Sequence, residues 1–399
     1  MTERTGSARM AAFAGSGIRR VFEAAGALEG AGVAIAHLEI GRPDFDTPTH
    51  IKAAAIDALQ SGRVHYTSNA GIPELRSAIA DKLARDNGLR VDPDGGIIVT
   101  VGAKESVFMC LYGLLDPGDE IIVPTPMWPD YLDTSKVVGA QPVEVPLQPG
   151  RGYQLDAGDL EGAITPRTKA IVVHSPHNPT GAVCDESTLR EVAELAVRSD
   201  LLVIADEIYE HLIYDEARHV SIASLPGMFE RTVTINGFSK AYSMTGWRLG
   251  YVAGPPALIS PLLKVHQCTT TCATSFAQWG AVAAYRGDQT CVTEMVREFD
   301  RRRRLVIEAL RGMPGVELVA PRGAFYAFPD VRRLGRSDLD VAEYLLREAH
   351  VATVPGSTFG ETGAGHLRIS YAAGYDILAG GLERMGRAVA ALASNAAIR

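Results

Sequence analysis

The sequence predicts an α/β protein whose large domain has a mainly parallel sheet of the seven-stranded type between helices. A smaller α+β domain is predicted to follow it. Short, β-branched apolar runs recur between residues 97 and 254. Most of them are continuous rather than alternating, as in strands that are buried on both faces. Helix-like stretches separate several of these runs, and this alternation is typical of a parallel sheet.

Six of the apolar runs are predicted as strands, at residues 97–101, 120–123, 170–173, 201–205, 232–235 and 249–253. Residues 106–115 and 189–199 are predicted as helices between strands. Residues 286–312 form one long, charged, amphipathic pattern, which predicts a single helix. Beyond it, strand-like and helix-like stretches alternate up to an alanine-rich helix.

The long predicted helix carries four consecutive arginines at residues 301–304. A basic run can contact nucleic acid. Here acidic side chains accompany it at Glu294, Glu298, Asp300 and Glu308. We therefore expect a solvated helix face with mixed charges rather than a nucleic-acid contact.

The length of 399 residues fits two domains, since domains average roughly 150 residues. Residues 46–285 are expected to form the large domain. Residues 1–45 and 286–399 are expected to form an N-terminal arm and the small domain.

The composition fits a soluble globular protein, with 46% hydrophobic and 22% charged residues. The net charge of −8 disfavours nucleic acid and anionic membranes as partners. There is neither a membrane-spanning apolar run nor a secretory leader pattern. The five cysteines form no CxxC pair, which favours a reducing compartment. We expect a cytoplasmic protein, and the spacing of the ten histidines predicts no metal site.

Three segments that follow predicted strands carry candidate binding groups. Gly102 and Ala103 open a helix directly after strand 97–101, and the unpaired N–H groups of a helix start attract phosphate. Most such junctions bind nothing. Asp206 ends strand 201–205 at the edge where α/β proteins bind ligands, although a helix N-cap is the alternative. Asn178 lies in a Pro- and Gly-rich loop that fixes its amide, and turn formation alone explains that loop equally well.

Lys240 follows the strand at 232–235 and has small and apolar neighbours. Burial disfavours an ammonium ion, so such a lysine can be neutral and can form a Schiff base with an aldehyde. Arg248, eight residues later, can bind a phosphate. No nicotinamide fingerprint and no P-loop are present. A phosphate cradle, a carboxylate, an oriented amide and a reactive lysine together fit pyridoxal 5′-phosphate.

Four ordered motifs carry a family resemblance: NPTG at 178–181, DExY at 206–209, SKxxxxTGWR at 239–248 and LRIS at 367–370. The sequence resembles the fold-type-I, pyridoxal-phosphate-dependent class I/II aminotransferases of the aspartate aminotransferase superfamily. The resemblance extends from Gly41 to Tyr371. It implies an aspartate aminotransferase-like fold and an enzyme that moves an amino group between an amino acid and a 2-oxo acid.

The resemblance implies roles for the residues around the reactive lysine. Lys240 resembles the lysine that binds the cofactor and carries the proton during catalysis. Asp206 matches the partner of the pyridine nitrogen, and Asn178 and Tyr209 match the donors to the phenolic oxygen. Trp128 resembles the aromatic ring that stacks on the cofactor and borders the substrate.

The resemblance also implies a phosphate site and a shared active site. Gly102, Ala103, Ser239 and Arg248 match phosphate-contacting positions, with Lys104 in the same turn. Tyr66 resembles a tyrosine that reaches the phosphate from the other subunit, which implies a homodimer with shared active sites. A fully active monomer would contradict this.

Substrate binding is implied at a third group of positions. Arg368 resembles the arginine that binds the substrate α-carboxylate, with help from the backbone of Gly41 and from Asn178. Lys104 resembles a lysine that contacts the distal carboxylate in one subgroup, which favours aspartate or glutamate, with aromatic substrates and prephenate as further options. An exposed helix-start lysine is the alternative. Arg9 and Ser16 resemble that subgroup's gate residues.

Some points stay open at the level of sequence. The same scaffold can run β-elimination, decarboxylation, or an oxidation or cyclisation in a biosynthetic pathway. A cofactor-sensing regulator is disfavoured because no basic recognition helix precedes Gly41. Phe325 and Tyr326 are expected to pack in the small domain, with substrate contact as the lesser option. His177 is expected to be a packed or solvent-facing neighbour. Arg42 is undecided between the border of the active site and a solvent-facing position. Residues 269–271 are undecided between the cofactor edge of the neighbouring subunit and a polar core patch.

Overall fold

The computed structural model of the chain describes residues 7, 10, 15 and 17–396. Its central sheet has the strand order β2-β8-β7-β6-β5-β3-β4. The strands are β2 (Ile97–Thr100), β3 (Glu120–Thr125), β4 (Gln141–Pro146), β5 (Thr168–His174), β6 (Leu202–Asp206), β7 (Thr232–Gly237) and β8 (Gly250–Ala253). Neighbouring strands are parallel except at β8, which is antiparallel to β2 and β7. The predicted α/β class and mainly parallel sheet are confirmed.

All six predicted strands form, each within three residues of its predicted ends. Strand β4 is not among the predicted strands. This strand lies at the edge of the sheet, and most of its side chains are at least partly exposed. Its sequence, QPVEVP, contains two prolines, which an edge strand tolerates because it has a free side. An edge strand therefore lacks the continuous apolar run on which the other predictions rested.

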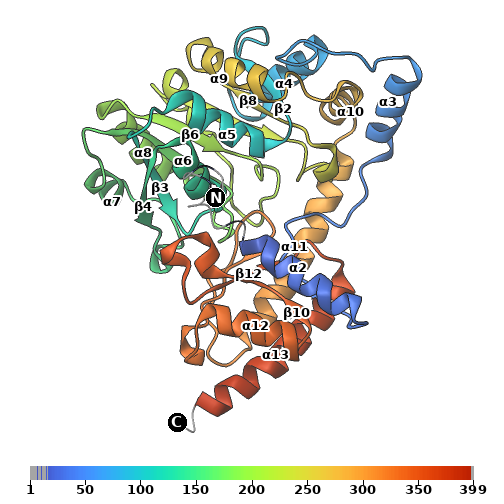
Figure 1. The fold of residues 1–399 in the computed structure, drawn as a ribbon, viewed down its shortest axis with the longest axis vertical. Helices are drawn as coiled ribbons and strands as arrows, with labels where there is room; N and C mark the ends of the chain where they lie inside the picture. The colour runs from blue at the N-terminus through green and yellow to red at the C-terminus, as the bar shows by residue number, and fades with distance from the viewer. Residues whose placement is uncertain (1–6, 8–9, 11–14, 16, 397–399) are drawn as a thin grey trace, which may run out of the picture.

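Helices cover both faces of the central sheet (Figure 1). On one face, α5 (Ala103–Leu114), α6 (Asp130–Val138) and α9 (Pro256–Thr269) pack on a core that includes Ile98 and Val172. On the other face, α3 (Thr49–Gln60), α4 (Pro73–Asp86) and α10 (Ser275–Arg286) pack near β2 and β8. Helix α8 (Glu186–Arg198) covers β5 and β6 on that face. Burial on both faces explains why the strand sequences are continuously apolar.

A second group of elements lies below the central sheet in Figure 1. It contains the antiparallel sheet β11 (Val354–Pro355), β12 (Leu367–Ser370) and β9 (Tyr326–Ala327). Helices α12 (Asp338–Glu348) and α13 (Tyr375–Ala396) belong to it, and α11 (Thr290–Arg311) runs down to it. The domain boundaries at residues 45/46 and 285/286 stay a prediction.

The N-terminal segment joins this second group. Helix α2 (Gly17–Gly30) precedes β1 (Ala36–His37), which pairs in parallel with β10 (Val351–Ala352). A short α-helix, α7 (Ala157–Gly162), and seven 3₁₀ turns complete the described elements. The turns are η1 (Pro149–Arg151), η2 (Ile222–Ser224), η3 (Phe229–Arg231), η4 (Thr245–Trp247), η5 (Arg332–Leu334), η6 (Gly356–Phe359) and η7 (Glu361–Gly363). Over residues 7, 10, 15 and 17–396, none of the helices has both the length and the apolar character for crossing a bilayer.

The arginine run in α11 corrects one expectation. Arg301 and Arg304 are exposed and pair with acidic side chains of their own helix, as expected. Arg302 and Arg303, however, are only 4% exposed. Arg302 forms two hydrogen bonds with Asp44, and Arg303 contacts residues 215 and 321. Half of the run therefore ties α11 to other segments instead of facing solvent, because partners distant in the sequence satisfy the buried guanidinium groups.

Candidate active site

A pocket of about 260 Å³ lies at the carboxyl edge of the central sheet. It contains all of the predicted site residues except Gly102 and Tyr66. The lining residues are Ile18, Gly41, Ala103, Lys104, Trp128, His174, Asn178, Asp206, Ile208, Tyr209, Ser239, Lys240, Arg248, Tyr326 and Arg368. A larger cleft, of about 750 Å³, is lined by none of the predicted residues. The residues that line the smaller pocket, rather than its volume, therefore identify it as the candidate active site.

Lys240 lies in the loop that follows β7, with its amine in the pocket. Its Nζ donates a hydrogen bond to the carbonyl oxygen of Gly41 at 2.7 Å. Burial, followed by the charges of Arg368 and Arg248, lowers the pKa of Lys240 to about 8, although Asp206 opposes the shift. An amine with this pKa is partly neutral near physiological pH and can act as a nucleophile or a base.

Asp206 is the last residue of β6 and is 1% exposed. Its carboxylate accepts hydrogen bonds from the Tyr131 hydroxyl at 2.9 Å and from the backbone N–H of Ile208 at 3.2 Å. Burial raises the pKa of Asp206 to about 6, and these two donors and Lys240 limit the rise. A buried carboxylate that is ionised at neutral pH can hold a cationic ring nitrogen.

Two polar side chains near Asp206 were missing from the predicted site. Tyr131 lies in the first turn of α6, and His174 ends β5 directly beside the end of β6. Burial lowers the pKa of His174 to about 3, so its ring is neutral. The rule that located Asp206, a polar residue at the end of a buried strand, would also have found His174. Tyr131 gave no comparable signal, because its contact with Asp206 spans 75 positions.

Arg368 lies in β12 and is 2% exposed. Its Nη1 donates to the amide oxygen of Asn178 at 3.1 Å, and its Nη2 donates to the carbonyl oxygen of Glu39 at 2.5 Å. Its Nε has no hydrogen-bond partner among the described residues. No carboxylate forms an ion pair with this guanidinium within that part of the chain. A buried cation with a free donor is suited to bind an anion such as a carboxylate.

Tyr209 lies in the turn after β6, and its hydroxyl lies 2.9 Å from the hydroxyl of Tyr326. Burial raises the pKa of Tyr209 well above its usual value, so the phenol is a donor. Phe325 and Tyr326 belong to the core around α11, as expected for packing residues. Tyr326 also lines the pocket. Its position therefore fits the lesser option, contact with the substrate, as well as packing.

Gly102 and Arg248 form one corner of the site. Gly102 precedes α5 and has a φ of +77°, and a Cβ at this position would lie 2.5 Å from Nη2 of Arg248. Glycine is therefore required on steric and conformational grounds. Ala103 at the start of α5, Arg248 and Ser239 all line the pocket. This combination of N–H groups and a cation suits a phosphate.

Lys104 and Trp128 lie at the opening of the pocket. The Lys104 side chain is 66% exposed, and its Nζ lies 5.8 Å from the centre of the Trp128 ring. Lys104 also forms an ion pair with Asp130. Tyr66 is 90% exposed and does not line the pocket of its own chain. Arg9 and Ser16 lie outside the described residues.

The structure shows where the residues with undecided roles lie. Arg42 is exposed. His177 is 3% exposed and its Nδ1 lies 2.7 Å from the Thr180 hydroxyl, so it is a packed neighbour, as expected. Residues 269–271 are exposed, so the interpretation of this segment as a polar core patch is wrong. Thr269 and Thr270 contact Glu105 at the start of α5.

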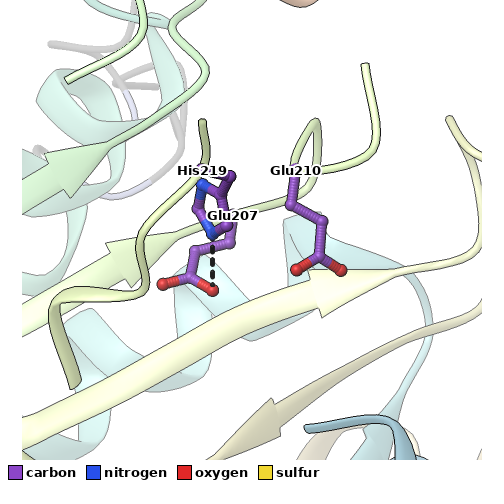
Figure 2. Close-up of side chains that lie close together, drawn as sticks. All are labelled: Glu207, Glu210 and His219. Carbon is purple, nitrogen blue, oxygen red and sulfur yellow. Dashed lines mark ion pairs between the residues drawn. The ribbon is translucent and has the colours of Figure 1, made fainter. Parts of the chain in front are cut away.

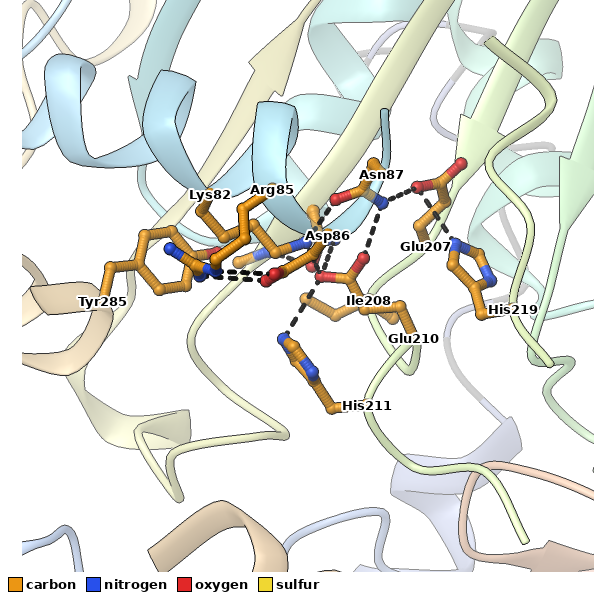
Figure 3. Close-up of polar contacts among 12 residues, drawn as sticks. Lys82, Arg85, Asp86, Asn87, Glu207, Ile208, Glu210, His211, His219 and Tyr285 are labelled. Atoms are coloured by element: carbon orange, nitrogen blue, oxygen red, sulfur yellow. Dashed lines mark hydrogen bonds and ion pairs between the residues drawn. The ribbon is translucent and has the colours of Figure 1, made fainter. Parts of the chain in front are cut away.

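A separate buried cluster follows Asp206 in the sequence. Glu207, Glu210 and His219 offer ligand atoms within 4.8 Å of one another, as a metal site would require (Figure 2). Nitrogen donors, however, already surround both carboxylates (Figure 3). Lys82 donates to Glu210, and Asn87 Nδ2 donates to Glu207 at 3.0 Å and to Glu210 at 2.8 Å.

The charges in this cluster nearly balance without a metal ion. Burial would raise the pKa of Glu210, but Lys82 and two histidines outweigh it and lower the pKa to about 2. Burial would lower the pKa of His219, but Glu207 and Glu210 outweigh it, so the pKa is raised. The arrangement therefore fits an ion-pair network better than a metal centre. The expectation of no metal stays a prediction.

Comparison with known proteins gives consistent matches over nearly the whole chain. Residues 34–377 match the family described as aminotransferase class I and II. An aspartate aminotransferase of Pyrococcus abyssi is 45% identical over 93% of this chain and 94% of its own length. An aromatic-amino-acid aminotransferase of Thermococcus litoralis is 43% identical over 93% of this chain and 94% of its own length.

A solved structure supports the same assignment. The aspartate aminotransferase of Thermus thermophilus, determined with maleate, aligns with a TM-score of 0.92 at 43% identity. The alignment covers 96% of this chain and 100% of that one. Together with the four motifs around the pocket, these matches show that the chain is an enzyme of the class I and II aminotransferase family.

Proposed function

We propose that the pocket binds pyridoxal 5′-phosphate and that Lys240 is the residue bonded to it. Class I and II aminotransferases as a family depend on this cofactor. The observation that carries the proposal is a pair of groups with opposite pKa shifts: the Lys240 amine, with a pKa lowered to about 8, and the buried Asp206 carboxylate, with a pKa raised to about 6. Groups tuned in this way are typical of catalytic sites.

The residues present fit the cofactor. The pocket volume of about 260 Å³ approaches the range of roughly 300–1,000 Å³ that is usual for small-molecule sites. At one end, Arg248 and the start of α5 can hold the phosphate. At the other end, Asp206 can hold the ring nitrogen. Tyr209 and Asn178 lie between these ends and can donate to the phenolic oxygen, and Trp128 can cover the ring.

The chemistry of the reaction divides between the cofactor and the chain. When bound, pyridoxal phosphate would supply an electron sink for the α-carbon of the amino acid. Asp206 keeps the ring nitrogen protonated, which strengthens this effect. The Lys240 amine would act as the base that takes the proton from the α-carbon of the amino acid and as the acid that returns it. General acid–base catalysis of this kind contributes roughly 10²–10⁴-fold.

Arg368 positions the amino acid for this proton transfer. Its guanidinium, held by Glu39 and Asn178, presents the unpartnered Nε toward an α-carboxylate. Binding the carboxylate at a fixed point orients the α C–H bond toward Lys240. Correct orientation is worth up to roughly 7–11 kcal/mol of the barrier.

For the substrates, we propose a dicarboxylic donor, aspartate or glutamate, with aromatic amino acids and prephenate as further substrates. Lys104 supplies a cation at the pocket opening, and Trp128 supplies an aromatic surface beside it. The names of the relatives support both classes, since they include aspartate and aromatic-amino-acid aminotransferases. Maleate, present in the Thermus thermophilus structure, is itself a dicarboxylate.

Two measurements test the function. Borohydride reduction of the holoprotein, followed by digestion and mass spectrometry, should place the cofactor on Lys240. Donor amino acids should then react with 2-oxoglutarate in a coupled assay. Absence of the label from Lys240 would contradict the cofactor site. Release of ammonia without an acceptor would support β-elimination instead of transamination.

We also propose that the active enzyme is a homodimer with shared sites. Tyr66 is 90% exposed, and the same segment exposes Ile56, Leu59 and Val64 at about half of their surface. Exposed apolar side chains grouped in one segment indicate a contact surface. Mixing inactive Tyr66→Ala and Lys240→Ala proteins should restore activity, because hybrid dimers contain one site with both native residues. Activity that stays at the level of the separate variants, with subunit exchange demonstrated, would refute shared sites.

A further inference from the structure

Lys104 is the cation expected to bind the distal carboxylate of the substrate, and within the chain it already forms an ion pair with the carboxylate of Asp130. Lys104 Nζ and Asp130 Oδ2 lie 2.7 Å apart. Lys104 belongs to the first turn of α5 and Asp130 is the first residue of α6, so two elements on the same side of the sheet bring them together. The Asp130 side chain is 16% exposed, whereas that of Lys104 is 66% exposed. The carboxylate is thus the better anchored of the two partners.

The ion pair is also the main compensation for the charge of Asp130. Its Oδ2 is buried and, apart from the Lys104 ammonium at 2.7 Å, has no hydrogen-bond partner among the described residues. An ionised oxygen that lacks other donors depends strongly on a nearby cation. A substrate carboxylate that binds Lys104 would therefore both displace Asp130 and approach its negative charge. The net charge at this end of the pocket is near zero instead of +1.

An aromatic side chain meets no such obstacle. Trp128 lies on the pocket side of the same pair, 5.8 Å from Lys104 Nζ, and packs edge-on against Tyr131 at 6.1 Å. Aromatic contacts of this kind stabilise an aromatic ligand without a charge partner. The pocket opening therefore offers an apolar surface beside a cation that is already neutralised.

We infer that Asp130 is a specificity-determining residue: it competes with the distal carboxylate of the substrate for Lys104 and thereby shifts donor preference from dicarboxylic toward aromatic amino acids. This inference rests on the proposed function, in which the distal end of the substrate lies near Lys104. Asp130 takes no part in the proton transfer. It acts mainly by occupying Lys104.

The test compares donors in the holoenzyme. Asp130→Asn keeps the shape of the side chain and removes its charge. It should raise the ratio of kcat/KM for aspartate to that for phenylalanine by roughly 5–30-fold, the effect of removing one like charge at a partly exposed site. In a Lys104→Met background, the same change should alter the ratio by a clearly smaller factor, since the competition for Lys104 is absent and only the direct repulsion by Asp130 remains.

Asp133 provides a matched control. It lies about one turn later on α6 and forms no ion pair with Lys104 among the described residues, although the charges of Asp130 and Lys104 both act on its carboxylate. Asp133→Asn removes a carboxylate that does not occupy Lys104 and should therefore change the ratio by a clearly smaller factor than Asp130→Asn. An Asp130→Asn ratio that is unchanged, or a shift of equal size in Asp133→Asn or in the Lys104→Met background, would overturn the inference.

Binding of an unreactive dicarboxylate separates this inference from the proposed activity. Maleate should bind the Asp130→Asn holoenzyme more tightly by a similar factor, whereas 3-phenylpropionate should bind with unchanged affinity. Tighter maleate binding in a protein that transaminates neither amino acid would refute the proposed function and leave the role of Asp130 standing. Transamination with unchanged maleate affinity would do the reverse.

Discussion

The hydroxyl oxygens of Tyr209 and Tyr326 lie 2.9 Å apart, although the two residues are 117 positions apart in the sequence. Tyr209 follows the central sheet and Tyr326 begins β9 of the second group of elements. Gly41 completes the contact, because a Cβ at that position would lie only 2.0 Å from the Tyr326 hydroxyl. Three distant segments therefore meet around one hydroxyl group beside the Lys240 amine.

This contact predicts a rescue experiment. Gly41→Ala should reduce kcat/KM by roughly a hundredfold, because the methyl group pushes Tyr326, which is 2% exposed and cannot swing away. Removing the hydroxyl in Gly41→Ala/Tyr326→Phe leaves the ring carbon 3.1 Å away as the nearest atom, so part of the loss should be recovered. Steady-state kinetics of both single variants and the double variant measure the coupling. Purely additive losses would show that the steric contact is irrelevant.

The phosphate corner predicts a glycine-specific effect. Gly102→Ala should weaken cofactor binding by roughly tenfold or more, since the new methyl group meets Arg248 at 2.5 Å. Gly62→Ala is the matched control, because Gly62 has a similar φ of +74° but no atom within 4 Å of its Cβ. The control should lose stability through backbone strain alone and keep its cofactor affinity. Equal losses of affinity in a cofactor titration would argue against the proposed corner.

The lowered pKa of Lys240 predicts a pH-dependent stability of the apoprotein. Below about pH 8 the folded state holds a buried ammonium ion, so Lys240→Met should be the more stable protein. Between pH 8 and the ordinary lysine value of 10.5, the unfolded chain binds the proton and the folded chain does not. The wild-type protein should therefore gain stability relative to Lys240→Met as the pH rises through this window.

Urea unfolding at a series of pH values measures this difference in the free energy of unfolding. Comparing the two proteins cancels the titration of all other groups that the substitution leaves unchanged. A difference that stays constant from pH 7 to 10 would mean that Lys240 has an ordinary pKa.

The ion-pair network beside the site predicts a large loss of stability. Lys82→Met leaves the Glu210 carboxylate buried without its main cation and should lower the free energy of unfolding by about 3–5 kcal/mol. Lys52→Met, which breaks the exposed pair with Asp46, should cost about 0–1 kcal/mol. Lys82→Met/Glu210→Leu should recover part of the loss, because no unpaired charge remains. Similar values for Lys82→Met and Lys52→Met in chemical denaturation would contradict this account.

The sequence by itself determined the α/β class, the six apolar strands and most of the residues that line the pocket. These features are local. A strand buried on both faces needs a continuous apolar run. A site residue lies at or shortly after the end of such a strand, as Asp206 does at the end of β6 and Lys240 does three residues after β7. The edge strand β4 escaped prediction because its partly exposed side chains carry no such pattern.

Only the tertiary structure decided the contacts between segments far apart in the chain. The Tyr131 hydroxyl on Asp206, Tyr326 beside Tyr209 and Asp130 beside Lys104 depend on how strands, helices and the second group of elements pack. The burial of Arg302 and Arg303 has the same origin, since each has partners outside α11 in addition to an acidic partner within it. The local sequence shows which charged and hydrogen-bonding groups each residue carries. The free energy of a charge or hydroxyl depends on its neighbours in space, and these exist only once the chain has folded.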